Sequence, residues 1–167
     1  FGSFLFLFYK MESLPIAKSK MTGSLCETLY LAKEEARTNY QEFVRTEHLL
    51  AGLINCRGTN IINEFLDIYR IDKLEILDRI ELIIPGPSSF KFDSRPEFNP
   101  RTKQSLNYAE DESANMNYQK IGTGHLLLGL IREPSGFAGE LLRDNLGMEL
   151  NSARNFVEEY YRLRKEI

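Results

Sequence analysis

The chain has 167 residues, 43% of them hydrophobic and 27% charged, with a formal net charge of −3. This composition is typical of a globular domain with its own core, and it lacks the basic excess of most proteins that bind nucleic acid or anionic membranes. Cys26 and Cys56 are too few for a disulfide framework or a four-ligand zinc site. We therefore expect reduced thiols, no metal and no cofactor.

The first ten residues, FGSFLFLFYK, are apolar but much shorter than the roughly 20 residues that span a bilayer. They also lack the basic start and the small-residue cleavage site of a signal peptide. We expect a translated or truncated leader over residues 1–23 that lies outside the domain. The alternative is that this leader is a fragment of a membrane anchor.

Apolar residues then recur at helical spacing, and no alternating β pattern is present. The spacing predicts four helices between residues 24 and 83. Thr46 is a suitable N-cap for the second helix, and the fourth begins near Asp72. The apolar positions of the four helices are Leu25, Leu29, Ala32, Ala36, Leu49, Leu50, Leu53, Ile54, Ile61, Ile62, Phe65, Leu66, Leu74, Leu77 and Ile80.

A connector and a second helical run follow. Four of the six prolines fall in PGPSSFKFDSRPEFNP, so we expect an extended connector over residues 84–99. Asn99 and Pro100 then provide an N-cap and a first-turn proline. Pro134 separates two later helices, and Gly147 is a natural C-terminal stop.

The two runs match each other with a shift of 77 residues, in which VRTEHLLAGLI at 44–54 recurs as IGTGHLLLGLI at 121–131 and His48 corresponds to His125. With a shift of 76 residues, Phe65 and Leu66 correspond to Leu141 and Leu142. Repeat one covers residues 24–83, repeat two covers 100–163, and 164–167 form a tail. We expect an all-α, pseudo-two-fold tandem repeat of a four-helix unit, with about eight helices. A mid-helix glycine costs about 1 kcal/mol relative to alanine, so Gly52 and Gly129 predict a close approach of helices. The residues expected to be buried between the copies are Leu49, Leu53, Leu126 and Leu130.

The stretches TEHLLAGLI, IGTGHLLLGLIRE and FNPRTKQSLNYAEDESA resemble the double Clp N-terminal motif, or Clp R domain. The resemblance covers about residues 24–163 and is nearest to the N-domain of ClpC-type AAA+ unfoldases or to stand-alone proteins with this domain. It implies an all-α pseudo-two-fold fold. It also implies a domain that docks substrates and adaptor proteins and delivers them to the unfoldase ring.

The sequence contains no phosphate loop of the form G-x-x-x-x-G-K-[ST], no H-E-x-x-H and no G-x-S-x-G. We therefore expect a binding module that is not an enzyme. It could also be the N-terminal part of an ATP-dependent unfoldase.

The start of the second helix in each repeat is the candidate site, because its free N–H groups and the helix dipole attract anions. In repeat one this site comprises Arg45, Thr46 and Glu47, and in repeat two it comprises Thr123 and Gly124. The resemblance implies that a Thr-Glu pair at this place binds phosphorylated arginine on marked substrates. Repeat two lacks the acid, and Arg45 stands where the family usually has glycine. The alternative is that Thr46 and Glu47 merely stabilise the helix start.

His48 and His125 occupy matching positions, and no third ligand lies at helical spacing from both. We expect each to be a structural residue, hydrogen-bonded to a neighbouring loop. Near the C-terminus, EEYYRLRKE predicts a solvated amphipathic helix, the alternative being a face that docks a partner.

These patterns favour a substrate- or adaptor-binding domain of the Clp unfoldase–protease system. Its expected partners are proteins: Clp unfoldase or protease subunits, adaptors, and substrates that include phosphoarginine-marked ones. We expect no nucleic-acid or membrane partner. The expected location is the cytoplasm, or the plastid stroma in a photosynthetic eukaryote. The alternative function is an accessory structural subunit that packs on the Clp protease core.

Overall fold

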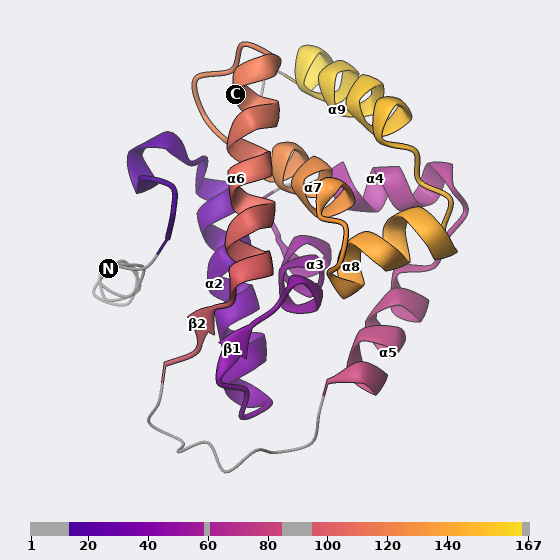
Figure 1. The fold of residues 1–167 in the computed structure, drawn as a ribbon. Coiled ribbons are helices and arrows are strands. Elements are labelled where there is room, and N and C mark those ends of the chain that lie inside the picture. The colour runs from indigo at the N-terminus through magenta and orange to yellow at the C-terminus, as the bar shows by residue number, and fades with distance from the viewer. Residues whose placement is uncertain (1–13, 59–60, 85–94, 165–167) are drawn as a thin grey trace.

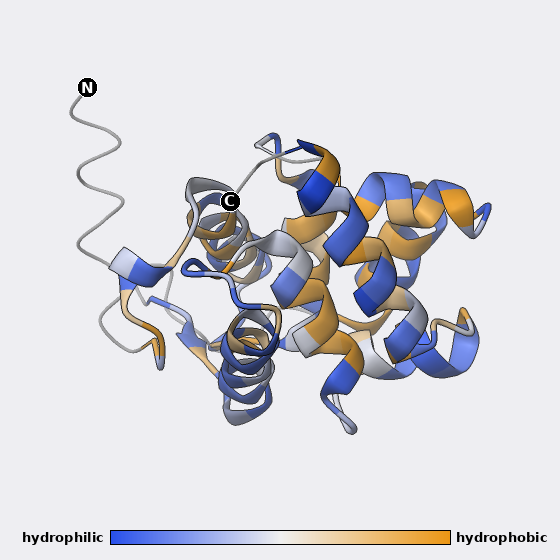
Figure 2. Ribbon diagram, turned by 90° about the horizontal axis from the view of Figure 1, so that it is seen from above, coloured by the Kyte–Doolittle hydropathy of each residue, from blue (hydrophilic) through white to orange (hydrophobic). Residues whose placement is uncertain are grey.

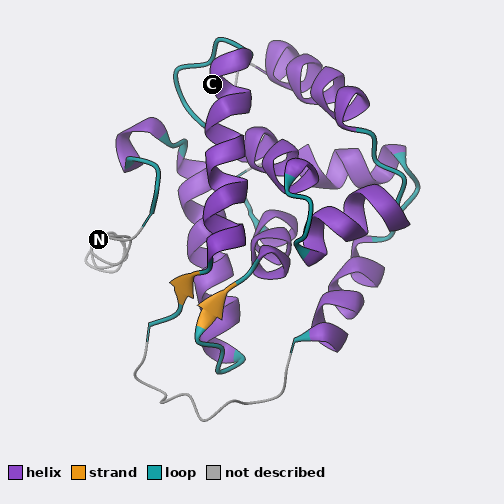
Figure 3. Cartoon of the chain, viewed as in Figure 1, coloured by secondary structure: helices purple, strands orange, loops and turns teal. Residues whose placement is uncertain are grey.

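The computed structural model describes residues 14–58, 61–84 and 95–164 (Figure 1). This part of the chain forms eight α-helices, α2 to α9, and two short strands, which confirms the predicted all-α class (Figure 3). The elements are η1 (Lys18–Lys20), α2 (Gly23–Thr38), β1 (Phe43–Val44), α3 (Thr46–Asn55), α4 (Ile61–Ile68), α5 (Lys73–Ile83), β2 (Glu97–Phe98), α6 (Pro100–Asn115), α7 (Thr123–Arg132), α8 (Phe137–Glu140), η2 (Leu141–Asn145) and α9 (Leu150–Arg164).

The two strands and one isolated bridge follow the repeat register, the alignment in which His48 corresponds to His125. β1 and β2 pair in parallel, with Val44 opposite Phe98. Their counterparts in the repeat register are Ile121 and Met21, which form a parallel bridge of their own. In each of these pairings, one residue comes from the first half of the chain and the other from the second half. The two pairings therefore connect the two copies.

Helix caps and left-handed residues repeat in the same register. Thr22 and Asn99 precede α2 and α6, and their side chains accept the N–H groups of the third residue on. This confirms the predicted cap at Asn99. Positive φ angles fall on Tyr40 and its counterpart Asn117, and on Arg70 and its counterpart Gly147. Gly147 is therefore the predicted stop after the third helical segment of repeat two.

The π-helical turn η2 marks an inserted residue. In repeat one, the N–H of Tyr69 bonds to the carbonyl of Phe65, four residues back. In repeat two, the N–H of Leu146 bonds to the carbonyl of Leu141, five residues back. A π turn accommodates one extra residue within a helix, which explains why the shift between the repeats returns from 76 residues at Phe65 and Leu141 to 77 at Arg70 and Gly147.

The core lies where α3 and α7 pack against each other and are enclosed by the other helices (Figure 1). Both hydrophobic and hydrophilic residues lie along the outer helices (Figure 2), as expected where one face of each is buried. Burial is complete at the four residues predicted to lie between the repeats, namely Leu49, Leu53, Leu126 and Leu130.

The domain begins before residue 23, so the predicted end of the leader at residue 23 is wrong. Ile16 and Met21 are buried in the core, with 3% and 4% of their surface exposed. Met21 is held there by its bridge to Ile121. The rest of the predicted leader, residues 1–13, lies outside the described residues, as does most of the connector. Within the described ranges, no helix has both the length and the apolar character of a membrane span.

The predicted close approach at the two mid-helix glycines sets the helix crossings. A Cβ on Gly52 would lie 2.5 Å from the carbonyl oxygen of Thr28, and one on Gly129 would lie 2.2 Å from that of Ser105. α3 therefore packs backbone-to-backbone on α2, and α7 on α6.

We predict that Gly129→Ala lowers the free energy of unfolding by about 1–3 kcal/mol, because the new methyl group forces α6 and α7 apart. Chemical denaturation followed by circular dichroism measures this loss. Gly23→Ala is the control, because a Cβ at Gly23 would meet nothing within 4 Å. This control should be neutral or stabilising, and equal stabilities of the two variants would contradict the prediction.

Candidate functional site

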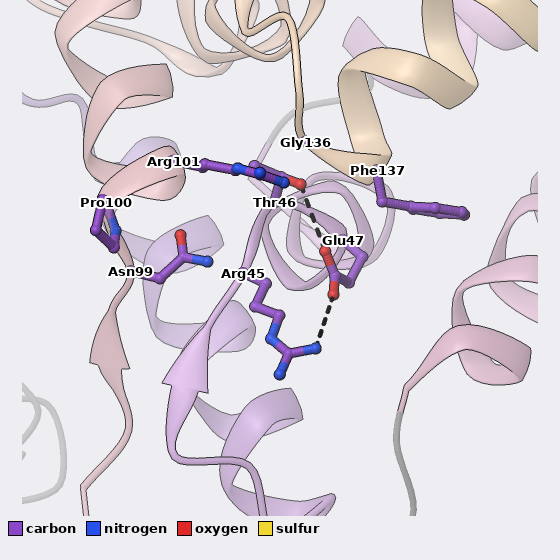
Figure 4. Close-up of a pocket in the computed structure, with 8 residues that line it drawn as sticks. All are labelled: Arg45, Thr46, Glu47, Asn99, Pro100, Arg101, Gly136 and Phe137. Carbon is purple, nitrogen blue, oxygen red and sulfur yellow. Dashed lines mark hydrogen bonds and ion pairs between the residues drawn. The ribbon is translucent and has the colours of Figure 1, made fainter.

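A pocket of about 380 Å³ opens where α3, α6 and α8 begin (Figure 4). Three predicted site residues, Arg45, Thr46 and Glu47, form one wall. The remaining lining residues were missed from the sequence, and they are Asn99, Pro100, Arg101, Gly136 and Phe137.

Thr46 is not the N-cap of α3, contrary to the sequence-based prediction. It is the first residue of the helix, and Arg45 holds the cap position without a side-chain capping bond. The Thr46 hydroxyl instead accepts the N–H of Ala138 at 3.3 Å and donates to Glu47 Oε2 at 3.4 Å. Thr46 therefore joins α3 to α8 and orients the neighbouring carboxylate.

The capping role belongs to the histidines. His48 Nδ1 accepts the N–H of Arg45 at 2.9 Å, and His125 Nδ1 accepts the N–H of Gly122 at 3.0 Å. Both rings are buried, and burial lowers the pKa of each to about 4. Each histidine is therefore neutral at pH 7 and fixes the start of its helix, in agreement with the structural role expected of it.

Glu47 is a buried carboxylate with weak partners. Only 5% of its surface is exposed, and this burial raises its pKa, against the opposing effect of the nearby Arg45 and Arg101. Arg45 Nη1 lies 3.9 Å from Glu47 Oε1. A carboxylate can accept about four hydrogen bonds, so these long contacts leave Glu47 able to accept a donor from a ligand.

The far wall of the pocket is held by the turn before α8. Arg101 Nη1 donates to the carbonyl of Ser135 at 2.6 Å, and the Arg101 side chain lines the same pocket as Thr46 (Figure 4). The carboxylate of Glu133 accepts the N–H groups of Ser135 and Gly136. A Cβ on Gly136 would lie 2.7 Å from the Thr46 side chain. Only glycine therefore lets this turn close against α3.

The matching place in repeat two, where Thr123 and Gly124 are expected to bind, is filled by side chains of α4 and α9. Both residues are buried. The N–H of Gly124 donates to the Tyr161 hydroxyl of α9 at 2.7 Å. A Cβ on Gly124 would lie 2.7–2.8 Å from atoms of Ile61, Tyr161 and Val157. Tyr161 therefore fills the space where repeat one has its pocket.

The packing of Tyr161 also corrects the prediction that the stretch EEYYRLRKE of α9 is solvated. Tyr160 and Tyr161 are 4% and 3% exposed, and the ring of Tyr161 packs against His125 with the centroids 5.1 Å apart. The available signal was the helical spacing of Ala153, Val157, Tyr160 and Tyr161, which lie on one face of α9.

The family model for the Clp repeat (R) N-terminal domain matches residues 20–145 and 97–165. The chain therefore belongs to this family.

Two relatives and one solved structure show the extent of the similarity. A ClpA homolog of Guillardia theta, an ATP-binding subunit of the ATP-dependent Clp protease, is 37% identical over 83% of this chain and 16% of its own length. The chloroplastic chaperone protein ClpC of Pisum sativum is 36% identical over 83% of this chain and 15% of its own. The ClpV N-domain in complex with a VipB peptide shares the fold, with a TM-score of 0.68, 16% identity and 89% of each chain covered. This chain thus spans less than a fifth of those two relatives.

We predict that Gly124→Glu lowers the free energy of unfolding by about 3 kcal/mol or more, because it buries a charge without a partner beneath Tyr161. Urea denaturation measures the loss. Glu81→Gln, at an exposed position on α5, is the control and should be neutral. A Gly124→Glu variant of unchanged stability would show that the second site opens readily.

We also predict a loss of stability in acid. The pKa of each histidine is about 4 in the folded state and about 6.5 when unfolded. The stabilisation is complete above pH 6.5 and falls as the pH drops toward 4, by about 3 kcal/mol per histidine. The raised pKa of Glu47 opposes part of this loss. NMR titration of the two rings provides the measurement, and a folded-state pKa near 6.5 at either would contradict the prediction.

Proposed function

We propose that this chain is the substrate- and adaptor-binding domain of a Clp unfoldase and catalyses no reaction itself. Its membership of the Clp repeat family supports this function, as do the names of its relatives, which are ATP-binding Clp subunits and ClpC chaperones. The ClpV N-domain, which shares the fold, is seen with a peptide. The chain's own sequence contains no phosphate loop. The partners are then proteins, in the cytoplasm or in the plastid stroma.

The observation that carries the proposal is the buried Glu47 carboxylate, which lies in a pocket of side-chain size at the starts of α3 and α6. An ionised carboxylate pairs bidentately with a guanidinium. The dipole at the start of α3 and the guanidinium of Arg101 favour an anion in the same pocket. A phosphorylated arginine on a substrate carries both groups, so it is the ligand that this arrangement supports best.

Arg45 changes this pocket from the pattern usual in the family. Its guanidinium lies 3.9 Å from Glu47, near the place that a ligand guanidinium would take. It therefore competes for the carboxylate and at the same time adds positive charge for a phosphate. Both effects raise the preference for phosphorylated over unmodified arginine.

We predict that Glu47→Gln weakens the binding of a phosphoarginine peptide by about ten- to a hundredfold, because it removes one charge-assisted hydrogen bond. Isothermal titration calorimetry gives the affinity. Glu75→Gln, at an exposed position on α5, is the matched control and should bind as the wild type does. Unchanged binding by Glu47→Gln, with the fold intact by circular dichroism, would restrict Glu47 to a structural role.

A second variant separates the two effects of Arg45. Arg45→Gly removes the competing guanidinium and should strengthen the binding of an unmodified arginine peptide by about tenfold, at about 1.4 kcal/mol per decade. It should change phosphoarginine binding less, because the lost positive charge offsets the gain. Titration of both peptides into the same variant measures the difference. Weaker binding of both would contradict the competition.

A further inference from the structure

A second concave site lies between α2 and α3, away from the pocket described above. This groove has a volume of about 170 Å³. Its apolar floor comes from Leu31, Ala51 and Gly52, and the carboxylates of Glu34 and Glu35 lie on one side. Asn55, at the end of α3, forms the opposite margin.

The other copy of the repeat shows what this geometry holds. In the repeat register, the counterparts of Leu31, Glu34, Glu35 and Asn55 are Tyr108, Asp111, Glu112 and Arg132. Arg132 lies over the Tyr108 ring at 4.3 Å from its centroid, 2.9 Å from Glu112 Oε1 and 3.6 Å from Asp111 Oδ2. Repeat two therefore fills its own groove with a guanidinium that two carboxylates contact.

A second arginine completes the arrangement in repeat two. Arg154 of α9 donates to both oxygens of Glu112, at 2.8 Å each. Glu112 is 1% exposed, and its pKa is lowered although burial alone would raise it, because both arginines favour the charged form. A carboxylate at this depth is thus compatible with the fold when guanidinium groups pair with it.

Repeat one keeps the carboxylates and lacks both arginines. Asn55 replaces Arg132, and Leu77 stands at the position of Arg154. Glu34 pairs with Arg37 one turn along the same helix, and Glu35 accepts from the Asn39 side chain at 3.0 Å. Arg37 donates from Nε and Nη2 to both oxygens of Glu34 at 2.9–3.2 Å, but both side chains are more than a third exposed. An exposed pair within one helix contributes at most about 1 kcal/mol, so a better-placed cation can displace it.

We infer that the α2–α3 groove binds the guanidinium group of an arginine side chain supplied by a partner polypeptide. The planar guanidinium can contact both carboxylates, as Arg132 does in repeat two, while its alkyl stem covers Leu31 and Ala51. A lysine ammonium cannot make the bidentate contact. This site is separate from the Glu47 pocket and does not depend on its function.

The experiment is an NMR titration of the ¹⁵N-labelled chain with N-acetyl-arginine amide. We expect saturable shifts of the Glu35, Gly52 and Asn55 amides, and weaker binding of N-acetyl-lysine amide. Asn55→Arg rebuilds the arrangement of repeat two, so it should abolish these shifts and raise the thermal midpoint. Glu35→Gln should weaken binding by at least about tenfold, the effect of one charge-assisted hydrogen bond.

Glu47→Gln separates this groove from the first pocket, because it should leave the shifts at Glu35, Gly52 and Asn55 unchanged. Three results would overturn the inference. These are no shift at those amides, shifts that persist in Asn55→Arg, and equal affinity for the arginine and lysine amides.

Discussion

Backbone contact at two glycines is the constraint on which the rest of the structure depends. Because Gly52 and Gly129 have no Cβ, α3 rests against α2 and α7 against α6. This close packing allows the leucines of α3 and α7 to fill one shared core. It also places the end of β1 beside the start of α6, where the carbonyl of Val44 accepts both the N–H of Asn99 and the hydroxyl of Thr102. The pocket walls are thus positioned by the same crossing that forms the core.

The two copies share a scaffold and differ in how they satisfy charge. At the start of the second helix, repeat one has Glu47 in an open pocket, whereas repeat two has Gly124 sealed by Tyr161. On the outer face, repeat two pairs Glu112 with two arginines, whereas repeat one leaves Glu35 beside a groove. The helix crossings are therefore the same in both copies, whereas Glu112 is paired within repeat two and the carboxylates of repeat one lie at a pocket and a groove.

The sequence predicted what depends on neighbouring residues. The helical spacing, the cap at Asn99 and the stop at Gly147 are local, and the structure has all of them. The close approach at Gly52 and Gly129 is a contact between helices, but a glycine in the middle of a helix indicates it by itself. The sequence did not predict the features that depend on packing between residues far apart in the chain. Tyr161 closes a site 37 residues away, and Gly136 completes a pocket whose other wall begins at Arg45. Thr46 was misplaced by one position because His48, and not a hydroxyl, caps the backbone.

A buried charge must find a partner, and the source of that partner decides what each copy can do. In repeat two, Arg132 of α7 and Arg154 of α9 pair with Glu112. This carboxylate therefore contributes to stability and is not available to a ligand. In repeat one, the contact of Arg45 with Glu47 is 3.9 Å long, and its guanidinium is more than a third exposed. At this length the pair makes no hydrogen bond, so it is readily exchanged for a ligand with better geometry. The weakness of this internal pair is the feature on which the proposed binding at Glu47 rests.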